Sequence, residues 1–118
     1  GEYSLLVCEL NGIDPTALQS GALQLTSKLG GKSALIIGGL SNESSKKLLF
    51  VVSFGNELVE LGLHAGKFIN NVAKICSGGG GGKANVAQAG AKDFNKLDEA
   101  LIFAKKELSS MLDYSSDK

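Results

Sequence analysis

The chain has 118 residues, 43% of them hydrophobic, and its twelve acidic and twelve basic residues give a formal net charge of zero. This length and composition predict one globular domain and exclude an intrinsically disordered chain. The zero net charge gives no support to nucleic-acid binding by bulk electrostatics, and no apolar run reaches the ~20 residues that a membrane-spanning helix needs.

The first quarter of the chain predicts a strand followed by a helix. Tyr3 to Leu10 is short and apolar, which is typical of a buried strand. Asp14 followed by Pro15 predicts a helix start, because aspartate caps free amides and proline fits the first helical position. Gly30-Gly31 predicts the helix end. Helical spacing predicts that one buried stripe consists of Leu18, Ala22, Leu25 and Leu29.

The next segment predicts a β-hairpin. Ser33 to Leu40 and Lys47 to Phe54 are apolar runs, and the polar segment Ser41 to Ser45 between them is typical of a turn. Glu57 to Leu63 is ambiguous, and we expect a short helical turn there.

Ala65 to Cys76 predicts an amphipathic helix. Its apolar face consists of Phe68, Ile69, Val72 and Cys76. Its polar face consists of Lys67, Asn70, Asn71 and Lys74. The glycine run Gly78 to Gly82 ends this helix, and we expect the run to form a loop.

The last quarter predicts a short strand at Val86 to Ala91 and then a terminal helix that Asn95 can cap. The apolar face of this helix consists of Leu97, Leu101, Ala104, Leu108 and Met111. We expect residues 1–113 to form the domain and 114–118 to form a frayed tail. The order β-α-β-β-α-glycine loop-α predicts an α/β (α+β) fold with one mixed sheet packed against helices in two or three layers.

Several kinds of catalytic or cofactor site are excluded by spacing. Gly31-Lys32-Ser33 resembles the end of a nucleotide-binding P-loop, but the required earlier glycine is absent and a strand follows instead of a helix. The glycine run does not fit the dinucleotide-binding pattern. One histidine, His64, and the distant cysteines Cys8 and Cys76 do not supply a zinc site, and a reduced intracellular chain is the expectation. We expect His64 to be a turn residue and Cys76 to be buried.

The glycine run leaves two interpretations open. It is either a flexible connector or a loop whose amides and Lys83 face an anion. Lys67 and Lys74 are seven residues apart, hence on one helical face, and with Lys83 they predict a local basic patch. All twelve cations are lysines, so base reading through the bidentate arginine fork is excluded, and recognition by shape and backbone remains. Solvated surface lysines are the alternative.

Three segments carry a family resemblance. They are the sequence HAGKFI at His64 to Ile69, GGGGGKANVAQAG at Gly78 to Gly90, and LDEAL at Leu97 to Leu101. Together they resemble the C-terminal globular domain of alanyl-tRNA synthetases, which is related to the DHHA1 domains found with DHH-type phosphoesterases. Two positions depart from the pattern, since many relatives have arginine and proline where this chain has Lys83-Ala84, and a second glycine where it has Ala91.

The resemblance implies a non-catalytic domain that binds the outer corner, or elbow, of tRNA and assists aminoacylation and editing by upstream domains of a cytoplasmic enzyme. It implies no cofactor for this domain. The implied contacts with RNA are Gly78, Gly79, Gly80, Gly81, Gly82, Lys83 and Gln88, with Lys67 and Lys74 from the basic patch. Phe94 is the best candidate for stacking on a base, with a core position as its alternative. Other functions left open are a dimerisation or protein-interaction module, a DNA-binding module, and the substrate-binding part of a phosphoesterase.

Overall fold

The predicted helices and strands occur in the predicted order, and the glycine run adds one strand that was not predicted. The computed structural model describes residues 4–12, 14–40, 48–92 and 94–116. In chain order the elements are β1 (Ser4–Glu9), α1 (Pro15–Leu29), β2 (Ser33–Leu40), β3 (Leu48–Phe54), α2 (Asn56–Glu60), α3 (Ala65–Ile75), β4 (Gly79–Gly82), β5 (Val86–Ala91), the 3-10 turn η1 (Phe94–Lys96) and α4 (Leu97–Ser116). The predicted fold class, the predicted β2–β3 hairpin and the short helical turn at α2 are confirmed.

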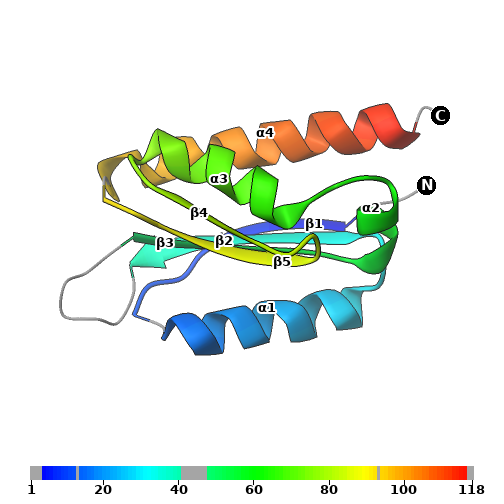
Figure 1. Ribbon diagram of the computed structural model, residues 1–118, viewed down its shortest axis with the longest axis horizontal. Helices are drawn as coiled ribbons and strands as arrows, with labels where there is room; N and C mark the ends of the chain where they lie inside the picture. Colours follow the sequence, from blue (N-terminus) through cyan, green and yellow to red (C-terminus); the bar gives the residue numbers. More distant parts are fainter. Residues whose placement is uncertain (1–3, 13, 41–47, 93, 117–118) are drawn as a thin grey trace.

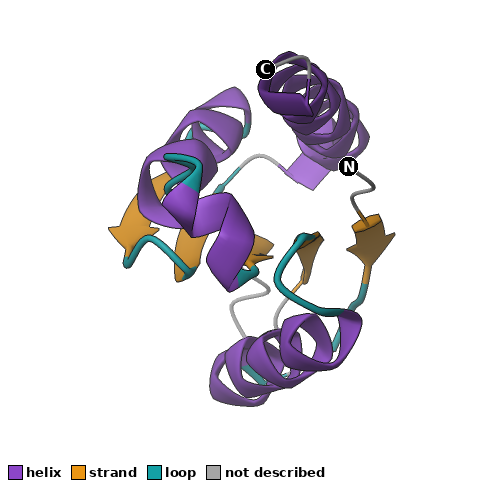
Figure 2. Cartoon of the chain, turned by 90° about the vertical axis from the view of Figure 1, so that its right-hand side faces the viewer, coloured by secondary structure: helices purple, strands orange, loops and turns teal. Residues whose placement is uncertain are grey.

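The five strands form one mixed sheet in the order β1-β2-β3-β5-β4. β1 runs parallel to β2, as a strand–helix–strand unit requires, and every other neighbouring pair is antiparallel. α1 covers one face of the sheet, and α3 and α4 cover the other (Figure 1). The end-on view in Figure 2 shows the same three layers. Two hydrophobic cores result, one on each side of the sheet.

The start and end of α1 are confirmed, but half of its predicted stripe is wrong. The Asp14 side chain accepts a hydrogen bond from the third residue of the helix, and Gly30 ends the helix at φ 106°. Leu18 and Ala22 are buried, whereas Leu25 and Leu29 are 36% and 43% exposed.

Thr26 takes the buried position in place of Leu25. It continues the row of Leu18 and Ala22 at four-residue spacing and is 5% exposed. Its hydroxyl lies 2.8 Å from the Ser53 hydroxyl on β3 and also donates to the Ala22 carbonyl. The burial of Thr26 costs little because its polar atom is satisfied.

The prediction that the first strand is buried is wrong. β1 lies at the edge of the sheet, so only one of its sides pairs with another strand. Leu5 and Val7 pack against the α3/α4 core, but Leu6 is exposed, as is Leu10 directly after the strand. An apolar run predicts a strand, but it does not show whether that strand lies at the centre or at the edge of the sheet. The order of the strands decides this.

The apolar face of α3 is confirmed, since Phe68, Ile69, Val72 and Cys76 are all buried. The helix ends in a Schellman motif, in which the Ser77 amide donates to the Lys74 carbonyl and the Gly78 amide to the Ala73 carbonyl. Ser77 adopts the left-handed conformation there, at φ 61°. The reversal out of α3 therefore uses the serine that precedes the glycine run.

The prediction that the glycine run forms a loop is wrong. Gly79–Gly82 is an edge strand that pairs with β5, which itself confirms the predicted strand at Val86 to Ala91. Glycine has a low strand propensity, so tertiary contacts have to stabilise β4. A Cβ added at Gly80 would lie 2.5 Å from Ala89, and one at Gly66 of α3 would lie 2.7 Å from the Gly82 carbonyl oxygen. Only glycine allows these backbones to approach so closely.

The terminal helix packs as predicted where it can be compared. Leu97, Ala104 and Leu108 are buried, with Ala100 in addition, and Leu101 is half-buried against the α3/α4 core. Asn95 lies within η1, directly before the helix. α4 continues to Ser116, into the segment predicted as a tail. The predicted turn at 41–45, the final residues 117–118 and the side chains of residues 94 and 111 lie outside the described residues.

The contrast between neighbouring glycines gives a stability prediction. We expect Gly80→Ala to lower the free energy of unfolding by about 2 kcal/mol, because its methyl group overlaps Ala89. Gly81→Ala, whose Cβ would meet no atom within 4 Å, changes stability by less than about 0.5 kcal/mol. Urea unfolding of both variants measures the difference, and equal stabilities would contradict the packing described for β4.

Candidate nucleic-acid interface

The turn between β4 and β5 is fixed against the N-terminus of α3. The Ala65 amide donates to the Ala84 carbonyl at 2.9 Å, and the Gly66 amide donates to the Lys83 carbonyl at 3.1 Å. The Lys83 amide closes the turn on the Val86 carbonyl at 2.9 Å. Free amides at a helix start are thereby satisfied by carbonyls of the turn. The turn and the start of α3 form one rigid corner, from which the Lys83 side chain projects.

The glycine amides that were expected to face an anion are partly engaged within the protein. The Gly78 amide donates to the Ala73 carbonyl, and the Gly80 amide lies 3.4 Å from the Asn70 side-chain oxygen. What the run offers to a partner is therefore its exposed backbone surface, since Gly79–Gly82 are all exposed.

The two faces of the β4–β5 hairpin differ. Gly80 and Gly82 stand opposite Ala89 and Ala87, which belong to the α3/α4 core. Gly81 stands opposite Gln88, on the face that looks toward α1. Because Gly81 has no side chain, this face presents bare backbone beside Gln88.

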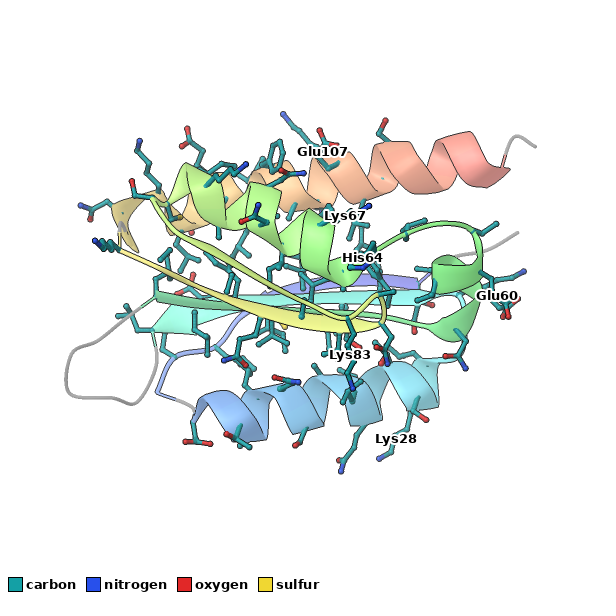
Figure 3. All side chains as sticks on the ribbon, in the orientation of Figure 1. Lys28, Glu60, His64, Lys67, Lys83 and Glu107 are labelled. Atoms are coloured by element: carbon teal, nitrogen blue, oxygen red, sulfur yellow. The ribbon has the colours of Figure 1, made fainter. Side chains whose placement is uncertain are left out.

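The predicted basic patch divides into two parts. Lys67, Lys74 and Lys83 are all exposed. The hydrogen bond from Gly66 to the Lys83 carbonyl brings the backbones of Lys67 and Lys83 together. Lys74 lies about 10 Å further along α3, at 1.5 Å per residue. In Figure 3, Lys67 lies on α3, whereas Lys83 points from the hairpin turn toward α1. The structure thus places cations on both sides of the hairpin.

A groove lies between α1 and the hairpin, and we call it the α1–hairpin groove. It has a volume of about 420 Å³. Its side-chain walls include Gln19, Leu23, Lys83, Asn85 and Gln88. A smaller hollow of about 260 Å³ shares Leu23 and Asn85 with it. Sequence reasoning found Lys83 and Gln88 but missed Gln19 and Leu23, whose only signal is that they lie one helical turn apart.

The histidine and the two cysteines that the sequence offered as possible ligands serve the fold. His64 caps α3, because its Nδ1 atom accepts a hydrogen bond from the Lys67 amide at 3.2 Å. Cys76 is buried in the α3/α4 core, whereas Cys8 packs on the other face of the sheet. Burial raises the pKa of the Cys8 thiol. Within the described ranges, no three histidine, cysteine or acidic side chains gather as a metal site would require, and no helix could span a bilayer.

The segment Gly31-Lys32-Ser33, which resembles the end of a P-loop, joins α1 to β2. The Ser33 hydroxyl donates to the Gly30 carbonyl at 2.6 Å and lies 3.2 Å from the Thr26 carbonyl. The side chain is completely buried where α1 ends and β2 begins. It is therefore directed into the protein, and the segment leads into a strand as predicted.

Comparison with known proteins identifies relatives over nearly the whole chain. The family described as DHHA1 domain matches residues 2–110. The chain is 58% identical over 118 residues to an alanine–tRNA ligase of Prochlorococcus marinus strain MED4, covering 100% of this chain and 13% of that protein. It is 46% identical over 113 residues to the same enzyme of strain MIT 9303, covering 95% and 13%. The chain thus spans about an eighth of the length of these relatives.

A solved structure has the same fold. The C-Ala domain from Aquifex aeolicus alanyl-tRNA synthetase matches with a TM-score of 0.77 and 28% sequence identity, covering 90% of this chain and 91% of that one. The arrangement of sheet and helices described above is therefore shared with that domain.

The His64 cap gives a prediction about the rigid corner. We expect His64→Ala to lower the free energy of unfolding by about 1 kcal/mol, because the Lys67 amide loses its acceptor. His64→Asn restores a side-chain acceptor suited to this position, so its loss is smaller. Chemical denaturation compares the two, and an equal loss for both would mean that the imidazole does not act as a cap.

Proposed function

Because this chain belongs to the DHHA1 domain family, we propose that it is the non-catalytic C-terminal domain of an alanine–tRNA ligase and binds the outer corner of tRNA. In this proposal the aminoacylation and editing reactions take place in upstream domains of a cytoplasmic enzyme. The domain holds one tRNA while both active sites act on it, and it needs no cofactor of its own.

The observation that carries the proposal is the bare strand backbone of β4 that ends in an exposed lysine. The tRNA corner offers sugar-phosphate backbone and the exposed surfaces of loop bases. Exposed glycine backbone at Gly79 and Gly81 permits close approach to such a surface, and Lys83 supplies a point charge for phosphate. Gln88, in the same hairpin, adds a carboxamide that can donate and accept hydrogen bonds.

The charge distribution supports recognition by shape. The chain has no arginine, so the bidentate contact that reads guanine is absent. Phosphate contacts fix position without reading sequence. Lys67, Lys74 and Lys83 supply three such contacts, for which log affinity falls with log salt concentration with a slope of roughly −2 to −3. A neutral domain with three phosphate contacts is thus suited to auxiliary binding of moderate affinity.

A second candidate function is a dimerisation or protein-interaction module. The observation that favours it is the open edge of β1, where Leu6 and Leu10 are exposed. An unpaired edge strand with apolar side chains is suited to pairing with another chain. Under this alternative, the domain binds tRNA and duplex DNA equally weakly, and its mass in solution rises with concentration.

Binding of an intact tRNA and of its acceptor-stem minihelix tests the proposal by fluorescence anisotropy at two salt concentrations. We expect tighter binding to the intact tRNA than to the minihelix or to duplex DNA. Lys83→Ala weakens it severalfold and reduces the salt slope by about 0.7 to 0.9, because one phosphate contact is lost.

Lys106→Ala is the matched control. It removes the same charge from an exposed position on α4, across the sheet from α1. Equal affinity for tRNA and minihelix, or equal losses in the two lysine variants, would overturn recognition of the tRNA corner through the hairpin.

A further inference from the structure

We propose that the α1–hairpin groove receives one unpaired nucleotide of the bound RNA, with α1 forming the wall opposite the glycine strand. The inference rests on the proposed function and extends it, because it names what the α1 side of the hairpin binds. It assigns ligand contacts to Gln19 and Leu23, which lie outside the glycine motif.

The groove lies where the hairpin faces α1. β5 pairs with β3 so that Gln88 stands opposite Val51, whose side chain belongs to the α1-side core. Gln88 and its neighbour across the hairpin, Gly81, therefore face α1. Of the elements packed against α1, β5 makes less contact than β3, and Gln88 is only half-buried. The groove lies on a part of this sheet face that α1 leaves uncovered.

Bare glycine backbone forms one wall of the groove. Gly66, Gly80 and Gly82 have no side chain because a Cβ at any of them would lie under 3.0 Å from other atoms of the protein. Gly81 is different, because a Cβ there would meet nothing within 4 Å, and its φ is not in the left-handed range. The fold itself does not require glycine at this position. A ligand that lies directly on the strand does require it.

The side chains in the walls of the groove have the chemistry that a nucleotide requires. Gln19, Asn85 and Gln88 each carry a carboxamide, which donates and accepts hydrogen bonds as the edges of nucleobases do. Leu23 is 37% exposed and offers an apolar surface to a base or ribose. Lys83, at the groove's end, is suited to the phosphate. The volume of about 420 Å³ falls within the ~300–1,000 Å³ range of small-ligand sites.

Charge distinguishes the groove from the other hollows, because Lys83 lines the groove whereas the adjoining hollow of about 260 Å³ has no charged residue in its lining and the two remaining hollows carry carboxylates. Among the residues that the structure describes, no aspartate or glutamate lines the groove. The hollow beside α2 is lined by Glu57 and Glu60, and the hollow at the end of β1 is lined by Glu9 and Asp98. Carboxylates repel a phosphate and a lysine attracts it, so the charges favour a nucleotide in the α1–hairpin groove.

The test is a side chain placed in the groove. Gly81→Val fills the space over the strand, and valine is favoured in strands, so the variant is expected to fold. Gly21→Val is the control, because Gly21 on α1 also has open space for a side chain and is not among the groove residues. Gln19→Ala, at a half-buried helix position, removes one wall contact without adding bulk.

Affinity for intact tRNA is measured by anisotropy, and the side-chain amide signals of Gln19, Asn85 and Gln88 are followed by NMR during the same titration. We expect about fivefold to tenfold weaker binding for Gly81→Val and a smaller loss for Gln19→Ala, which matches the loss of one or two hydrogen bonds. Gly21→Val binds as the parent chain does, and the three amide signals shift when tRNA is added.

The outcomes separate this inference from the proposed function. If the parent chain binds tRNA and both Lys83→Ala and Gly81→Val weaken binding, but Gln19→Ala binds normally and the Gln19 amide signal does not shift, no nucleotide enters the groove and the inference is wrong while the proposed function stands. If the parent chain does not bind tRNA, both are overturned.

Discussion

The close approach of α3, β4 and β5 is the contact on which the rest of this structure depends. Gly66 lies against Gly82, and Gly80 lies against Ala89, at distances that leave no room for a Cβ atom. This packing places α3 against the edge strand of the sheet, which stabilises a strand that has no side chains of its own to pack. It also brings the hairpin turn to the start of α3, where carbonyls of Lys83 and Ala84 satisfy the first free amides of the helix.

The same packing explains how a neutral domain can present a binding surface. Alternate glycines of β4 are needed inside, and the glycines between them leave the opposite face without side chains. Lys83 and Gln88 are held at fixed positions around that face by the turn and by the pairing of β5 with β3. A preorganised surface loses little conformational entropy on binding, so few charges are needed. We infer that the local geometry of the hairpin, rather than net charge, determines what the domain binds.

Much of the fold could be predicted from local signals, and the failures have physical causes. Asp14, Pro15 and Gly30 fixed the limits of α1, because capping acts within one turn. Thr26 could not be recognised as buried, because its partner Ser53 lies 27 residues away. β4 could not be predicted because glycine opposes strand formation locally, and only its contacts with α3 and β5 stabilise it. The groove lies between α1 and the hairpin, which are far apart in the sequence. The glycine motif therefore indicated Lys83 and Gln88, but no local signal indicated Gln19 and Leu23.

Amide hydrogen exchange of the glycine run tests most directly the claim that it is a packed strand. The amides of Gly78 and Gly80 donate to Ala73 and Asn70, and β4 pairs with β5 along its length. We therefore expect these two amides to exchange on the order of 100-fold more slowly than in an unstructured peptide. Exchange at the unstructured rate would show that the run is a flexible connector, which would contradict the arrangement of the hairpin, the lysines and the groove derived from it.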